Sequence, residues 1–165
     1  RTSESLDDVR SAMIEVVENP EFANENIRQA LDFLIQTAQA PRTGVLGLDF
    51  GGGWSLNSAI LLPDELDAVV IFYGTVSENE VRLAGLNAAV LGLFAENDRS
   101  IPLTTVRSFE QVLQKLGKTY EIEIYPDVEH SFANPSSPNY NAQVAEQAWS
   151  RTFEFLNRYL SVSVD

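Results

Sequence analysis

Three short, continuously apolar runs place the strongest constraint on the fold of this chain. They are GVLGL at 44–48, DAVVIFY at 67–73 and AAVLGLF at 88–94. Runs of this kind, separated by stretches of helical spacing, are typical of strands buried on both faces of a parallel sheet. A fourth run, YEIEIY at 120–125, alternates glutamate with isoleucine. We therefore expect one wet face there, and a position at or near a sheet edge.

Helical spacing fills the intervals between these runs. The predicted helices span 54–62, 103–116 and about 141–160, and two more precede the first strand, the second of them beginning near Asn24. Strands that alternate with helices of this length predict right-handed crossovers and an α/β fold. We expect about four mostly parallel strands flanked by helices.

Size and charge limit the classes of function. The 165 residues suit one domain, taken as 1–165. A net charge of −13 repels phosphate backbones and anionic lipid, so neither nucleic acid nor a membrane is an expected partner. The longest apolar run, 68–73, is far too short to cross a bilayer, and we expect a cytoplasmic protein. The chain has no cysteine and one histidine, so we expect no metal site and no cofactor.

Three chemically active residues follow the predicted strands. Asp49 ends the first strand in GLDFGGGWS, Asp98 follows the third in AENDRSIP, and His130 follows the fourth in YPDVEHSF. The carboxyl ends of parallel strands meet at one edge of a sheet, where active sites gather. A nucleophile between glycines, then an acid, then a histidine is the chain order of the α/β-hydrolase triad. We expect the turn to need glycine at 47, 51 and 52.

The chain resembles the dienelactone hydrolase family of α/β-hydrolases. The resemblance rests on GLDFGGGWS, DAVVIFYG, AAVLGLFAENDRSIP, YEIEIYPDVEHSFAN and AWSRTFEFL, which occur in family order and spacing over about residues 25–160. It implies hydrolysis of small esters or lactones by a triad. It also implies that the chain corresponds to the carboxyl-terminal portion of the fold, a truncated domain without the upstream strands and the loop that carries a second oxyanion-hole donor.

The resemblance assigns roles to several positions. Asp98 becomes the triad acid, His130 the triad base, and the backbone N–H of Phe50 an oxyanion-hole donor. The expected substrate-binding residues are Trp54, Tyr73, Phe132 and Asn134. Asn134 stands where dienelactone hydrolases have an arginine that holds the substrate carboxylate, which argues against dienelactone itself as the substrate.

Asp49 stands where the family has its cysteine nucleophile, and three interpretations are open. It is a nucleophile like the aspartates of haloalkane dehalogenases and epoxide hydrolases, which attack saturated carbon and leave the histidine to activate water. Alternatively, its side chain caps the following helix. In the third interpretation, it replaces a residue that was formerly catalytic. The expected function is accordingly a hydrolase of small ester, lactone or alkyl substrates. The alternative is an inactive relative that serves as a binding or assembly module, a pseudoenzyme.

The predicted strand at 44–48 lacks the neighbour that this fold usually supplies. An unpaired, apolar strand edge promotes aggregation unless something covers it. We expect either a homodimer that pairs these edges across a two-fold axis, or the amino-terminal helices folded over the edge. If the site is active, a small-molecule substrate is the other expected partner.

Overall fold

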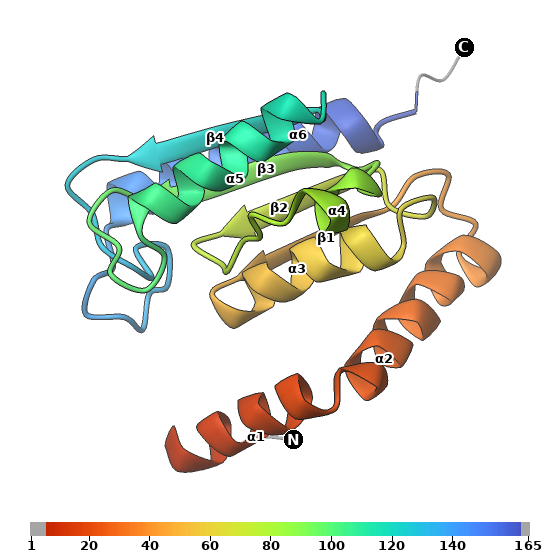
Figure 1. Ribbon diagram of the computed structural model, residues 1–165, viewed down its shortest axis with the longest axis horizontal. Coiled ribbons are helices and arrows are strands. Elements are labelled where there is room, and N and C mark those ends of the chain that lie inside the picture. The colour runs from red at the N-terminus through yellow and green to blue at the C-terminus, as the bar shows by residue number, and fades with distance from the viewer. Residues whose placement is uncertain (1–5, 163–165) are drawn as a thin grey trace. The chain divides into compact units, whose positions relative to one another are not determined.

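The computed structural model describes residues 6–162, and the chain divides into two compact units between Ala40 and Pro41 (Figure 1). The first unit contains α1 (Leu6–Glu18), α2 (Pro20–Asp32) and a π-helical turn, η1 (Phe33–Thr37). Helix α2 begins at Pro20, not near Asn24 as predicted, because proline suits the first turn of a helix, where its missing N–H is not needed.

The second unit is built on a four-stranded parallel sheet. Its strands are β1 (Gly44–Leu48), β2 (Ala68–Phe72), β3 (Ala89–Ala95) and β4 (Tyr120–Tyr125). They lie in the order β1-β2-β3-β4, with Leu48 paired to Phe72 and Phe72 to Leu93. The α/β fold class predicted from the apolar runs is confirmed, and β1 and β4 are the two edges of the described sheet.

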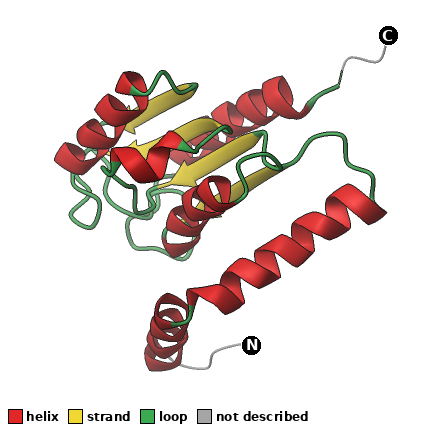
Figure 2. Ribbon diagram, turned by 45° about the vertical axis from the view of Figure 1, so that its right-hand side comes forward, coloured by secondary structure: helices red, strands yellow, loops and turns green. Residues whose placement is uncertain are grey.

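Helices cover both faces of the sheet (Figures 1 and 2). On one face lie α3 (Phe50–Leu61), α4 (Glu80–Ala84) and α5 (Leu103–Lys115), and on the other lies α6 (Ala142–Leu160). Helix α3 begins four residues before the predicted start at 54, directly after Asp49. The short helix α4 was not predicted; Asn79 caps it by accepting a hydrogen bond from the N–H of Arg82.

Buried side chains pack on both faces of the sheet, and one continuous cluster lies between the sheet and α6. Every residue of β2 and β3 is buried, as the continuous apolar runs predict. Ala148 and Phe155 of α6 pack against this layer and are fully buried. Phe153, which belongs to the apolar spacing of α6, is instead 65% exposed. Among the described residues, no helix combines the length and apolarity needed to cross a membrane.

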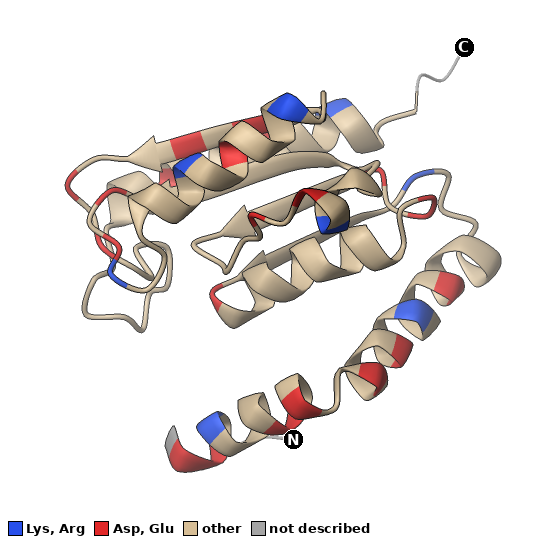
Figure 3. Cartoon of the chain, viewed as in Figure 1, with Lys and Arg blue, Asp and Glu red and all other residues tan. Residues whose placement is uncertain are grey.

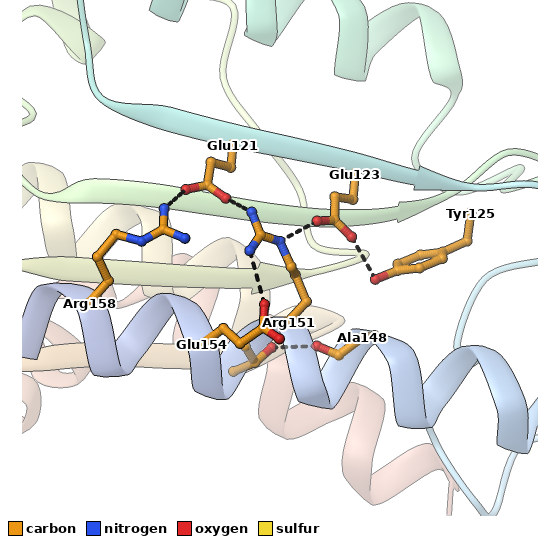
Figure 4. Close-up of polar contacts among 8 residues, drawn as sticks. Glu121, Glu123, Tyr125, Ala148, Arg151, Glu154 and Arg158 are labelled. Atoms are coloured by element: carbon orange, nitrogen blue, oxygen red, sulfur yellow. Dashed lines mark hydrogen bonds and ion pairs between the residues drawn. The ribbon is translucent and has the colours of Figure 1, made fainter.

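The glutamates of β4 are not on a wet face, so that expectation is wrong. Glu121 and Glu123 point toward α6, where Arg151 binds both of them (Figure 4). Arg151 also binds Glu154 of α6, at 3.2 Å, and Arg158 binds Glu121. The Tyr125 hydroxyl donates to Glu123 at 3.0 Å. The alternation in β4 therefore marks an ionic interface between the edge strand and its covering helix.

Candidate active site

Asp49 lies at a sharp turn between β1 and α3. Its φ of 53° and ψ of −119° form a left-handed conformation that costs a non-glycine residue about 1–3 kcal/mol. A Cβ atom at Gly47 would lie 1.9 Å from the carbonyl oxygen of Gly51, and one at Gly52 would lie 2.9 Å from Cα of Gly74. Both positions therefore require glycine. A Cβ at Gly51 would meet no atom within 4 Å beyond its own helix, so the expectation that Gly51 is needed is wrong.

The Asp49 side chain does not cap α3. It makes no capping hydrogen bond and is 62% exposed. The backbone carbonyl of Asp49 instead accepts from the N–H groups of Gly52, at 2.9 Å, and Gly53, at 3.3 Å. The N–H of Phe50 belongs to the first helical turn, where N–H groups have no acceptor within the helix and the dipole favours negative charge. The capping interpretation is wrong, and the carboxylate is directed elsewhere.

Asp98 follows β3, and its side chain is fully buried. Its Oδ1 accepts from the backbone N–H groups of Ser100, at 2.7 Å, and Ile101, at 2.9 Å. Its Oδ2 lies 2.7 Å from Nδ1 of His130. These contacts hold the carboxylate in one orientation. The neighbouring carboxylate of Glu96 instead accepts from the backbone N–H of Asp127, at 3.3 Å.

His130 joins the two aspartates. Its Nε2 lies 3.2 Å from Oδ1 of Asp49, while Nδ1 faces Asp98. Asn139 donates to the His130 carbonyl at 3.0 Å and so ties down the segment that carries the imidazole. The Tyr73 ring lies edge-on to the imidazole, with centroids 5.2 Å apart. Residues from three strand ends thus form one continuous hydrogen-bonded chain.

The two contacts of His130 restrict its protonation. An ionised carboxylate only accepts hydrogen bonds, so two carboxylate contacts require an N–H on both ring nitrogens. A ring with a hydrogen on both nitrogens has no lone pair to act as a base. Nε2 becomes available as a base once Asp49 no longer accepts a hydrogen bond from it, for example after esterification of Asp49. The ring carries at most one positive charge beside two aspartates.

A cavity of about 740 Å³ lies beside Asp49. It is walled by the ends of β1 and β2, the segment after His130, and α6. The apolar and aromatic part of its lining includes Leu48, Tyr73, Ala133, Tyr140, Ala145 and Trp149. Asp49, Tyr73 and Ser131 line it with positive φ angles of 53°, 37° and 66°. Strained backbone at a cavity is typical of a functional site.

Tyr73 is the buried polar residue of this cavity. It is 1% exposed, and its hydroxyl has no hydrogen-bond partner among the described residues. Burial, together with the charge of Asp49, raises the pKa of Tyr73 to about 12. The hydroxyl therefore stays protonated at ordinary pH and remains a potential donor. An unpaired buried hydroxyl costs about 1–3 kcal/mol, which a bound ligand could recover.

Of the other three expected substrate-binding residues, Asn134 lines the cavity and the other two do not. Asn134 lines the cavity, and its Oδ1 accepts from the N–H of Ser136 at 3.0 Å. Phe132 is fully buried and packs its ring on Tyr73 and Tyr125, so it is a core residue and not a lining residue. Trp54 lies half-buried on α3, next to Phe50, and does not line this cavity.

The sequence analysis missed most of the lining residues, among them Tyr140, Glu146 and Trp149. Glu146 lies on the face of α6 that also presents Ala142, Ala145 and Trp149 to the cavity. This is helical spacing, and it could have been read from the sequence once α6 was known to border the site. Among residues 6–162, no group of three or more His, Asp or Glu side chains is arranged to hold a metal ion.

The topology defines the class of protein. A parallel sheet whose first strand enters a helix through a glycine elbow, with acid and histidine after later strands, is an α/β-hydrolase fold. Within that class, the chain belongs to the dienelactone hydrolase family, which matches residues 2–160. The family resemblance drawn from the five sequence segments is confirmed.

Individual relatives agree with this assignment. The chain is 35% identical over 104 residues to a "Putative carboxymethylenebutenolidase" of Escherichia coli (strain K12), covering 58% of this chain and 38% of that protein. It is 32% identical over 113 residues to a protein of the same name from Saccharolobus solfataricus, covering 68% and 43%. The crystal structure of a "Putative Dienelactone Hydrolase" from Klebsiella pneumoniae superposes with a TM-score of 0.64 at 30% identity, covering 69% of this chain and 51% of that one. The matched part spans less than half the length of the two curated relatives.

The elbow glycines provide a direct test of the turn. We expect Gly47→Ala to lower the free energy of unfolding by about 3 kcal/mol, because the new methyl group would overlap the Gly51 carbonyl. Gly51→Ala is the matched control and should be neutral or stabilising, because alanine is the better helix former. Urea unfolding followed by tryptophan fluorescence measures both. Equal effects of the two variants would contradict this account of the elbow.

The Tyr73 hydroxyl is tested in the same way. We expect Tyr73→Phe to leave the free energy of unfolding unchanged or to raise it by up to about 1 kcal/mol, because an unpaired buried hydroxyl is removed. Tyr125→Phe, which loses the bond to Glu123, should lower it by about 1 kcal/mol. A loss for Tyr73→Phe as large as that for Tyr125→Phe would show that the Tyr73 hydroxyl is paired.

Proposed function

We propose that this chain carries a hydrolase site for small esters or lactones, or for activated alkyl substrates. One observation carries the proposal: Asp49, His130 and Asp98 form a continuous hydrogen-bonded chain beside a cavity of about 740 Å³. Membership of the dienelactone hydrolase family supports the same class of reaction. The substrate is a small molecule, and the proposal includes no cofactor.

The Asp49 carboxylate is the proposed nucleophile. It attacks the carbon of the substrate, which releases the leaving group and forms an ester on Asp49. Nε2 of His130 gives a proton to the departing group, which leaves the ring neutral. The same nitrogen then takes a proton from a water molecule whose oxygen attacks the ester carbonyl. Breakdown of this intermediate passes that proton to the released product and restores the Asp49 carboxylate. The N–H of Phe50 stabilises the developing oxyanion, and Asp98 keeps the imidazole oriented. Attack at saturated carbon is favoured, because attack at acyl carbon would give an anhydride.

Activity assays with variants at Asp49 test this proposal. We expect the chain to hydrolyse p-nitrophenyl acetate or a haloalkane, and Asp49→Asn to reduce the rate at least about 100-fold. Asp127→Asn is the control, since it neutralises an exposed carboxylate next to the histidine segment and should retain activity. In a single turnover in ¹⁸O-labelled water, the label should enter Asp49 and not the released alcohol.

An inactive relative that serves as a binding or assembly module is the second candidate. The 3.2 Å contact between His130 and Asp49 favours it, because a closed ion pair occupies both the nucleophile and the base. The same assays separate the two candidates. If the chain and Asp49→Asn are equally inactive while Asp49→Cys gains activity, Asp49 is a lesion and the hydrolase proposal fails.

For the partner of this chain, we infer a second copy that pairs with the edge of β1. The Asp49 N–H donates to the Phe72 carbonyl at 3.0 Å, and N–H groups alternate sides along a strand. This alternation directs the N–H groups of Leu46 and Leu48 away from β2. The Leu46 side chain is also 37% exposed, so both polar and apolar groups of this edge can contact a partner.

Sedimentation velocity tests the homodimer. We expect the chain to sediment as a dimer and Leu46→Pro to sediment as a monomer, because proline removes an outward N–H that the partner strand needs. Leu46→Ala shortens the same side chain but keeps the N–H, and should remain dimeric. A monomeric parent chain, or dimeric Leu46→Pro, would contradict pairing through this edge.

A further inference from the structure

The cavity beside Asp49 carries a charge pattern that the proposed function does not explain. Two carboxylates line it, Asp49 from the elbow and Glu146 from α6, and no lysine or arginine does. His130 carries at most one positive charge, and it contacts two aspartates, Asp49 and Asp98. Acidic residues are also spread over both units (Figure 3), and the whole chain carries −13. The cavity therefore lies in a negative potential.

The neutral part of the lining suits an organic cation. Tyr140 and Trp149 line the same space as the two carboxylates, together with the buried Tyr73. Aromatic faces attract ammonium groups, most strongly when the cation is partly desolvated, as in a cavity. Aromatic rings combined with carboxylates are the usual surroundings of quaternary ammonium groups in proteins. By contrast, a substrate carboxylate would meet neutral polar residues, such as Ser131 and Asn134, and no lysine or arginine in the described lining.

The buried Tyr73 hydroxyl is an independent sign of a missing ligand. It has no partner among the described residues, although Tyr73 is 1% exposed and lines the cavity. Tyr73 therefore holds an unused donor behind the cavity surface, and the surface itself is negative and aromatic.

We propose that this site takes esters whose cavity-bound group is an organic ammonium ion, that Glu146 selects the positive charge, and that carboxylate-bearing substrates are excluded. The inference deepens the proposed function and rests on the same site. It sets this chain apart from relatives that are named for carboxymethylenebutenolide, a carboxylate. Binding can be measured without turnover, so the two proposals can fail separately.

Three ligands of matched shape test the charge preference by isothermal titration calorimetry. Choline is the cation, 3,3-dimethylbutan-1-ol its neutral isostere and 3,3-dimethylbutanoate the anion. We expect choline to bind at least about tenfold more tightly than the alcohol, and the anion to show no binding. Acetylcholine should likewise exceed 3,3-dimethylbutyl acetate in kcat/KM by a similar factor.

Variants at position 146 test whether Glu146 is responsible for the preference for a cation. Glu146→Gln should abolish most of the choline preference over the alcohol, and Glu146→Arg should reverse it in favour of the anion. Glu110→Gln removes the same charge from α5, outside the cavity lining, and should leave the preference unchanged. Choline binding without any hydrolysis would support the inference while the hydrolase proposal fails. Equal binding of choline and the alcohol, binding of none of the three, or a preference insensitive to Glu146→Gln would overturn it.

Discussion

The close approach of α3 to β1 and β2 is the constraint on which the site depends. Gly47 leaves room for the Gly51 carbonyl, and Gly52 lies against Gly74, so the chain passes from strand to helix within one residue. This turn forces the positive φ of Asp49 and directs its carboxylate out of the sheet. The parallel register then brings the ends of β3 and β4 to the same edge, where Asp98 and His130 follow. A side chain at either crowded glycine would displace the helix and separate Asp49 from the imidazole.

The charged groups of Asp49, His130 and Asp98 contact one another directly. Asp98 is fixed by two backbone donors and His130, and both ring nitrogens of His130 contact carboxylates. The remaining negative charge at Asp49 borders a cavity that contains a second carboxylate, Glu146, and aromatic rings. On the sheet edge at β4 the chain neutralises its glutamates with Arg151 and Arg158. Among the described residues, no arginine or lysine lines the cavity, so the carboxylates of Asp49 and Glu146 are not neutralised in the same way. A positively charged substrate would supply the missing positive charge.

Much of the fold could be predicted from the hydrophobic periodicity of the sequence. The proximity of the site residues could be predicted from their order along the chain. Apolar runs of five to seven residues identified three strands. Both faces of β2 and β3 are buried, whereas β1 is an apolar edge strand that is only partly buried. Asp98 and His130 were placed near Asp49 because parallel strands end at one edge. The start of α3 and the role of Gly51 were wrongly predicted, and Phe132, expected at the substrate, lies in the core, since each depends on which atoms approach from another element. Tyr140 and Glu146 were missed because their contribution requires the position of α6.

The sequence by itself determined the α/β class, the family, and the identity of the residue at the elbow. Buried strands appear in the sequence as continuous apolar runs, and a sharp turn appears as closely spaced glycines, so both can be recognised along the chain. Only the tertiary structure decided that the Asp49 side chain contacts His130 and does not cap its helix, that the β4 glutamates face arginines, and that the Tyr73 hydroxyl is unpaired. Each of these outcomes depends on the distance between groups far apart in the chain. Hydrogen bonds and ion pairs form over about 3 Å, a precision that residue spacing does not encode.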